Sequence, residues 1–217
     1  MNVNVPKVAD PGVRDALVEA AARLLSSEGP SALSARRLAG EIGTSTMAVY
    51  THFSGMDDLR RAVRREGFSR LAGHLDAVRR TADPVADVAA LGWAYCFNAL
   101  ANPHLYRAVF LEAPADPDDA ALGTATFSRL VAAIGRCIES GRFAPADPGS
   151  LAVQLWTGTH GMIVAAMAGL FSPDEVREHL SGMARHLFVG FGDSAESSAR
   201  SIERARRRME RLIPAVA

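Results

Sequence analysis

Residues 33–53 constrain the fold of this chain more than any other stretch, because their local signals predict two short helices joined by a tight turn. Ser34 is the predicted N-cap of the first helix. That helix should end near Gly43, since glycine accepts the left-handed conformation of a helix C-terminus. Ser45 is the predicted N-cap of a second helix over residues 46–52, which is too short to persist without tertiary contacts.

Two short helices in this order are the arrangement of a helix-turn-helix, whose second helix enters the major groove of DNA. Val49 and Phe53 are four residues apart and should both face the protein core. The N-terminal residues of the second helix then approach the base edges. In this chain those residues are Thr46, Met47 and Ala48.

The same stretch resembles the N-terminal DNA-binding domain of TetR-family transcriptional regulators. The resemblance covers about residues 13–75 and rests on Leu-Ser-Ala-Arg-Arg-Leu-Ala at 33–39, the Gly-Thr-Ser turn and the Val-Tyr-Thr-His-Phe ending. It implies phosphate contacts by Tyr50 and His52. The full set of predicted DNA-contacting residues is Arg36, Thr44, Ser45, Thr46, Met47, Ala48, Tyr50, Thr51 and His52.

One position departs from the family pattern. Many members carry a lysine just after the recognition helix that anchors a phosphate, and this chain has Met56 there. The missing charge should slightly lower the salt dependence of DNA binding. The alternative interpretation of Tyr50, His52 and Phe53 is that they only fill a corner between helices.

The distribution of charge favours DNA binding by the N-terminal part. The chain has 24 Lys+Arg and 24 Asp+Glu, so its formal net charge is zero. Residues 1–80 nevertheless carry 12 basic against 9 acidic residues, and residues 81–190 carry 6 against 11. Positive charge therefore concentrates where DNA is predicted to lie.

Other functional classes have less support. The N-terminus lacks the basic and apolar segments of a secretory signal, and Cys96 and Cys137 lie in apolar helical contexts, so we expect a cytoplasmic protein with reduced thiols. Residues 151–171 carry no formal charge but include polar side chains and lack interfacial anchors, which favours a buried or dimer-forming helix over a membrane span. No spacing predicts a metal site, a cofactor site or a catalytic triad.

The rest of the chain is predicted to be helical, so the fold class is all-α. A first helix should begin after Asp10, and residues 113–119 should form a mobile acidic loop. A terminal amphipathic helix over 194–213 should bury a side that includes Ala195 and Ala199. The helix after residue 54 should have an outer side formed by Arg60, Arg61, Arg64 and Arg65.

A second motif lies in the predicted C-terminal domain. Trp156 and His160 share a helix face and precede Gly161, which resembles the Trp-x-x-x-His-Gly signature of the WHG class of TetR-like C-terminal domains. Two interpretations stay open: the pair borders an effector pocket, or it packs in the core or at a dimer interface. The predicted effector-contacting residues are Trp93, Phe97, Tyr106, Phe110, Trp156 and His160.

These patterns predict a homodimer with four segments: a helix-turn-helix domain over 1–54, a linking helix over 55–82, an effector-binding and dimerisation domain over 83–192, and a C-terminal helix or tail over 193–217. The predicted partners are a palindromic double-stranded DNA operator and a small apolar or aromatic effector that releases a repressor. The alternatives are an activator or ligand-independent regulator of the same fold, and, more remotely, a helical enzyme or structural dimer. Salt-dependent, sequence-specific DNA binding would distinguish the regulators from a helical enzyme or a structural dimer.

Overall fold

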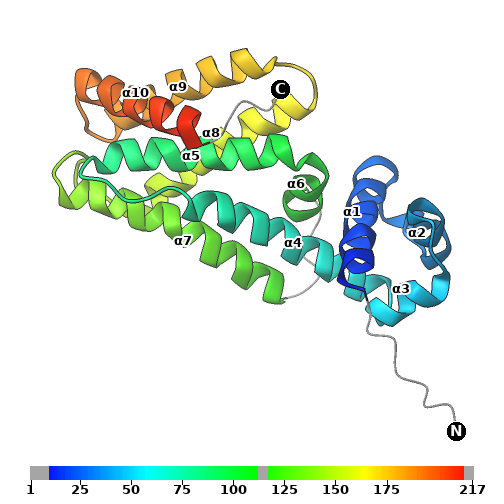
Figure 1. The fold of residues 1–217 in the computed structure, drawn as a ribbon. Coiled ribbons are helices and arrows are strands. Elements are labelled where there is room, and N and C mark those ends of the chain that lie inside the picture. The colour runs from blue at the N-terminus through cyan, green and yellow to red at the C-terminus, as the bar shows by residue number, and fades with distance from the viewer. Residues whose placement is uncertain (1–9, 112–116, 213–217) are drawn as a thin grey trace, which may run out of the picture. The chain divides into compact units, whose positions relative to one another are not determined.

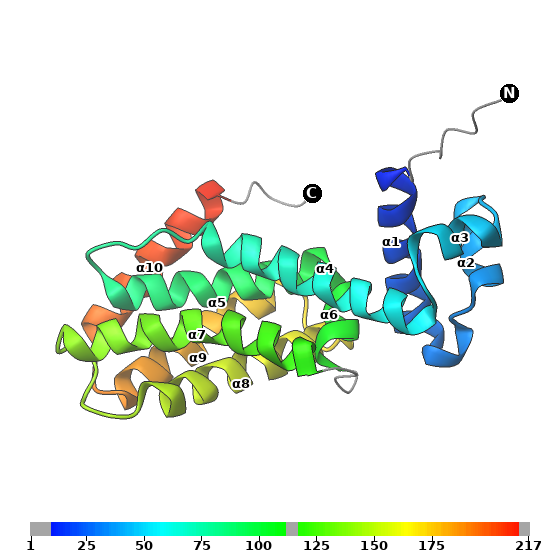
Figure 2. The same cartoon turned by 90° about the horizontal axis from the view of Figure 1, so that it is seen from below.

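A computed structural model describes residues 10–111 and 117–212, and these residues form helices joined by turns (Figures 1 and 2). No strand occurs in this described part of the chain. One short 3-10 helix, Pro30–Ala32, accompanies the α-helices. The α-helices are α1 (Pro11–Glu28), α2 (Ala35–Ile42), α3 (Thr46–His52), α4 (Met56–Asp76), α5 (Pro84–Ala101), α6 (Pro103–Phe110), α7 (Pro117–Glu139), α8 (Pro148–Met167), α9 (Pro173–Gly190) and α10 (Ala195–Leu212).

The helices group into two compact units. Of the described residues, the first unit comprises 10–69, 104–111 and 117–122, and the second comprises 70–103 and 123–212. Helix α4 contributes residues to both units, and nearly all of α6 joins the first. These units are defined by contacts within the structure. The boundary expected near residue 82 separates predicted functional domains, and it stays a prediction.

Helix starts follow the local sequence signals. The Asp10 carboxylate accepts a hydrogen bond from the Gly12 N–H at 2.9 Å, as expected at the N-cap of α1. At the start of α9, the Ser172 hydroxyl oxygen accepts from the Glu175 N–H, and the Glu175 carboxylate accepts from the Ser172 N–H. Both arrangements satisfy N–H groups that lack a partner within the helix.

A single hydrophobic core joins α1, α2, α3, the first half of α4 and α6 within the first unit. Leu17, Leu38, Val49 and Leu59 are fully buried, and Leu105 of α6 is almost fully buried. Burying a side chain of this size contributes about 1.5–3 kcal/mol relative to leaving it exposed. The short helix α3 is therefore held in place by tertiary contacts, as its length requires.

In the second unit, α5 packs against α8 and α10, and α9 packs against the same two helices (Figure 1). Helix α5 is apolar on several sides, and its Val85, Val88 and Ala94 are fully buried. Among the described residues, no helix is both long and apolar enough to cross a membrane.

The expected position of Arg64 on the outer side of α4 is wrong. Its side chain is buried, and its guanidinium donates a hydrogen bond of 2.6 Å to the Ala108 carbonyl of α6. The last carbonyls of a helix have no N–H partner within that helix, so a neighbouring donor can satisfy them. Arg64 supplies such a donor, which explains why a charged residue lies inside.

Two further expectations need correction. Ala195 and Ala199 of α10 are exposed, whereas Ser198 and Ser201 are buried because their hydroxyls donate to Asp193 at 2.7 Å and Asp83 at 2.8 Å. The predicted loop over 113–119 falls partly on residues 112–116, outside the described residues. The helix α7 already begins at Pro117, within the segment predicted to be a loop.

Candidate nucleic-acid interface

The turn between α2 and α3 is defined by backbone contacts. Gly43 has φ of 68°, a left-handed conformation that glycine adopts without steric cost. The N–H groups of Gly43 and Thr44 both donate to the Ala39 carbonyl, the latter at 2.8 Å. The Ser45 hydroxyl oxygen then accepts from the Ala48 N–H at 3.2 Å and starts α3. The predicted helix-turn-helix and both of its caps are confirmed.

Helix α3 is anchored on one side only. Val49 is fully buried, and Phe53, directly after the helix, is 3 % exposed. The Arg14 guanidinium of α1 lies 5.5 Å from the centre of the Phe53 ring, a cation–π contact across the base of the motif. These contacts fix the orientation of α3, as the spacing of Val49 and Phe53 predicted.

The opposite side of α3 presents its side chains to solvent. Met47 is 74 % exposed and Tyr50 is 58 % exposed, values unusual for large side chains with apolar bodies. Thr46 and Thr51 are also exposed, whereas Ala48 and His52 are half-buried. The surface therefore offers a thioether, a phenol and hydroxyl groups, which suit apolar contacts with thymine methyl groups and hydrogen bonds to bases and phosphates.

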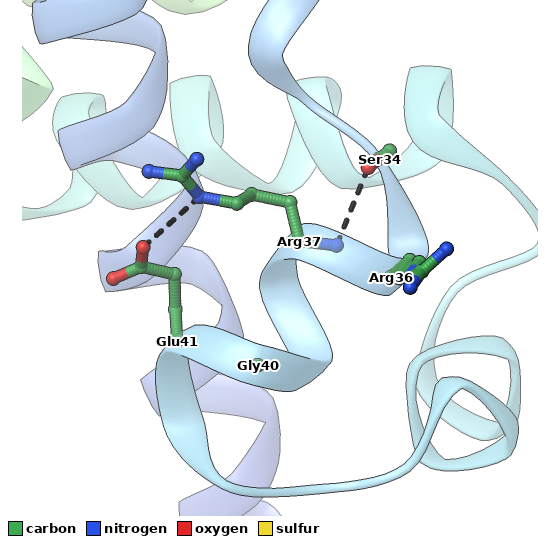
Figure 3. Close-up of a pocket in the computed structure, with 5 residues that line it drawn as sticks. All are labelled: Ser34, Arg36, Arg37, Gly40 and Glu41. Atoms are coloured by element: carbon green, nitrogen blue, oxygen red, sulfur yellow. Dashed lines mark hydrogen bonds and ion pairs between the residues drawn. The ribbon is translucent and has the colours of Figure 1, made fainter.

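Two adjacent arginines on α2 differ in whether an acidic side chain balances their charge. Arg37 donates to Glu41 at 3.1 Å and to Glu28 of α1 at 2.9 Å, so its charge is balanced. Arg36 is exposed and has no hydrogen-bond or ion-pair partner among the described residues. Figure 3 shows Arg37 extending toward Glu41 while Arg36 points away from both. A surface recess of about 390 Å³ lies along these residues.

Sequence reasoning identified Met56 as a missing phosphate contact, and the structure gives the reason for the methionine. Met56 is half-buried and packs against the hydrophobic core of the first unit. Near Met56, the Asp58 carboxylate accepts a hydrogen bond from the backbone N–H of Ser54 at 3.0 Å. This hydrogen bond is the main reason why the pKa of the Asp58 carboxyl is lowered. The start of α4 is thus fixed by packing and by this local hydrogen bond.

The predicted effector residues do not form one group. In the second unit, the Trp156 indole donates to the Tyr95 hydroxyl at 3.2 Å, and that hydroxyl lies 3.3 Å from Nδ1 of His160. The Trp156 and His160 rings stack with their centres 5.2 Å apart, and Phe127 packs edge-on against Trp156 at 6.3 Å. Burial lowers the pKa of His160.

Of this cluster, the predicted set omitted Phe127 of α7 and also Tyr95. Tyr95 is a buried residue of α5, and the only sequence signal was that its hydroxyl, in an apolar helix, would need a hydrogen-bond partner. Trp93 and Phe97 lie on other sides of α5: Trp93 borders a small cavity with Leu180 and Met183, and Phe97 contacts His74.

The remaining two predicted effector residues belong to the first unit. Tyr106 is buried, and its ring centre lies 4.8 Å from that of Phe110. Phe110 also contacts Phe68 of α4 at 5.9 Å. This aromatic packing joins α6 to α4. No group of three or more potential metal ligands occurs among the described residues.

Comparisons with known proteins agree with this geometry. Residues 17–63 match the family model described as bacterial regulatory proteins, tetR family, and residues 88–187 match the model described as tetracyclin repressor-like, C-terminal domain. The second model does not carry the WHG designation, so that subtype stays a prediction.

Individual relatives are also regulators. The chain is 28 % identical to an uncharacterised HTH-type transcriptional regulator of Mycobacterium tuberculosis, over 82 % of this chain and 80 % of that protein. It is 34 % identical to the HTH-type transcriptional repressor DrrR1 of Streptomyces coeruleorubidus, over 42 % of this chain and 30 % of the repressor. The crystal structure of AibR in complex with isovaleryl coenzyme A and operator DNA shares the fold, with a TM-score of 0.66, 21 % identity, and coverage of 81 % of this chain and 98 % of AibR.

Proposed function

Because this chain belongs to the TetR family of regulatory proteins, it is a DNA-binding transcriptional regulator, and we propose that it is a homodimeric repressor released from a palindromic operator by a small apolar or aromatic effector. The observation that carries the proposal is the anchoring of α3 on one side and the exposure of Met47 and Tyr50 on the other. A helix held in this way presents a rigid surface to the major groove.

We assign the DNA contacts as follows. Thr46, Met47, Ala48 and Thr51 read bases, and the hydroxyl of Tyr50 contacts the phosphate backbone. Thr44, Ser45 and His52 flank this surface and contribute further polar contacts. Arg36 supplies a phosphate contact, because its charge has no partner among the described residues, whereas Arg37 is already paired with two carboxylates.

The dimer is supported by apolar exposure along α8 and α9. Val153 of α8 is 50 % exposed, Val189 of α9 is 41 % exposed, and Leu170 in the turn between them is 69 % exposed. Burial of such residues against a second copy would remove apolar surface from water. Two copies related by a two-fold axis would place two recognition helices on half-sites of a palindrome.

The effector proposal rests on the aromatic residues of the second unit and on the fold shared with AibR, which was solved with isovaleryl coenzyme A and operator DNA. Tyr95, Trp156 and His160 offer an apolar surface with a polar centre, although they also satisfy one another. A ligand-independent regulator is the alternative if these residues serve packing alone, and an activator of the same fold is a separate alternative. We infer a cytoplasmic location because the protein acts on chromosomal DNA, and the regulator relatives favour no enzymatic activity.

The test is fluorescence anisotropy with DNA from the intergenic region upstream of the protein's own gene and with a shuffled control of equal length, each at two salt concentrations. We expect tight, salt-sensitive binding to the intergenic DNA only. Met47→Ala should weaken this binding without changing the weak affinity for shuffled DNA, whereas His52→Ala should weaken both in proportion if it contacts a phosphate. Equal affinity of wild type and Met47→Ala for a confirmed operator would refute the docking of α3.

The effector is tested separately by calorimetry on free and operator-bound protein. A compound that releases the operator must bind the free state more tightly, because linkage requires the two effects to be reciprocal. Equal affinity for both states would refute release by that compound and leave the DNA-binding proposal unaffected.

A further inference from the structure

A basic groove in the second unit has no role in the proposed function. It has a volume of about 340 Å³, near the lower end of the range of small-molecule pockets. Its walls come from the end of α4, the segment that follows it, α5 and α7. The lining residues that matter here are Leu75, Arg80, Asp87, Leu91, Ala132 and Arg136.

The acidic side chains at this groove are already neutralised. The Asp87 carboxylate, 2 % exposed, accepts from the Thr81 backbone at 2.9 Å and from two guanidinium groups, those of Arg136 and Arg208, each at 3.2 Å. Two positive charges thus share one negative charge. The Asp76 carboxylate, which also lines the groove, accepts two hydrogen bonds from the Arg129 guanidinium, from Nε at 2.8 Å and from Nη2 at 3.0 Å.

Arg80 adds a charge that nothing balances. It is exposed, lines the groove, and has no hydrogen bond or ion pair with any described residue. Its neighbour Arg79 is also exposed but is not among the lining residues. The groove therefore has an excess of positive charge, made of Arg80 and the surplus guanidinium at Asp87. Such a site favours an anion, which arginine can bind through two parallel hydrogen bonds.

The lining of the groove is also partly apolar. Leu75 and Leu91 are almost fully buried and line the groove, and Ala132 lines it from α7. An inorganic anion would leave this surface unused, and a neutral hydrocarbon would leave the charge unmatched. We propose that this groove binds a small amphipathic carboxylate, with the carboxylate at Arg80 and Arg136 and the hydrocarbon part against Leu75, Leu91 and Ala132.

The experiment is isothermal titration calorimetry of the full-length protein without DNA, so its result does not depend on the operator. Octanoate is the probe, 1-octanol tests the need for charge, and inorganic phosphate tests the need for the hydrocarbon part. We expect octanoate to bind at least about tenfold more tightly than either control, since a charge-assisted hydrogen bond and buried hydrocarbon each contribute. Equal affinities for octanoate and octanol, or no octanoate binding, would overturn the proposal.

Three variants at exposed positions locate the site. Arg80→Ala should weaken octanoate binding about tenfold at low salt, and Arg79→Ala, which removes the same charge one residue away, should change it less than about twofold. Ala132→Glu places a carboxylate on the wall at an exposed helical position and should abolish octanoate binding while circular dichroism stays unchanged. Equal effects of Arg79→Ala and Arg80→Ala would show that only the general charge matters and would refute the assigned groove.

Discussion

Gly67 of α4 provides a sharp test of the packing that supports the DNA-reading unit. A Cβ at this position would lie 2.5 Å from Cγ2 of Val109 and 3.4 Å from the backbone carbonyl of Leu105, both in α6. Cγ2 is part of a short, branched side chain that cannot move far, so α6 would have to shift. Gly73, on the same helix, is exposed, and a Cβ added there would meet no neighbouring atom within 4 Å.

The two glycines should therefore respond in opposite directions to alanine. Replacing glycine by alanine inside a helix normally stabilises by about 0.5–1 kcal/mol, so Gly73→Ala should raise the free energy of unfolding by this amount. At Gly67 the same gain is opposed by overpacking, which costs about 1–3 kcal/mol. We expect Gly67→Ala to destabilise by up to about 2 kcal/mol, or roughly 4–8 °C in Tm for a chain of this size.

Val109→Ala identifies the cause. It removes the atom that clashes, at a cost of about 1.6 kcal/mol for two buried carbons, and Gly67→Ala in this background should stabilise because the new methyl group occupies the vacated space. Urea unfolding at fixed protein concentration measures all four variants, since a dimer has concentration-dependent stability. If Gly67→Ala has the same sign in both backgrounds, the close approach of α4 and α6 does not control stability.

The remaining predictions concern charge and base reading. Arg36→Ala should reduce the slope of log K against log salt by about 0.9 for each phosphate that the protein no longer neutralises, measured by anisotropy; Arg37→Ala should instead cost up to about 1 kcal/mol of stability, and an equal slope change in both would refute the assignment. Burial alone would raise the pKa of Asp193, but hydrogen bonds from Arg142 and its neighbours lower it, so this stabilisation is present above about pH 4 and lost on further acidification. Asp193→Asn should accordingly flatten the acid limb of the urea midpoint, and an unchanged pH profile would contradict this. Thr46→Arg should change which operator bases are preferred in a binding-site selection, and an unchanged consensus would argue against base contact there.

Helix boundaries were predictable because their signals are local. A cap such as Ser34 or Ser45 acts on N–H groups two or three residues away, and Gly43 adopts its left-handed conformation without help from distant residues. The same holds for the two long helices that begin after Asp147 and Ser172. The exposure of α3 was predictable for a related reason, since four-residue spacing alone selects the buried side.

The sequence did not predict which side chains of a helix are buried where a residue far along the chain decides this. The buried position of Arg64 depends on the carbonyl of Ala108, 44 residues away, and the inward rotation of Ser201 depends on Asp83. The predicted effector residues do not form one cluster, because their positions also depend on distant partners. Aromatic side chains on an all-round apolar helix can face any of several neighbours, and α5 directs Trp93, Tyr95 and Phe97 to three different surroundings.

The arginines show that the ability of a charge to bind a ligand depends on the partner it has in the folded structure. Arg36 and Arg37 are neighbours with the same chemistry, yet only Arg37 is balanced, by carboxylates from two helices. Arg64 satisfies a helix carbonyl, and Arg136 shares Asp87 with another guanidinium. A charge that is already neutralised releases no counterions and attracts no ligand. Binding sites on this protein are therefore found by accounting for the partner of each charge. Among the arginines that line the two recesses described above, Arg36 and Arg80 lack a partner among the described residues and Arg136 shares one, so these are the side chains that can bind an external anion there.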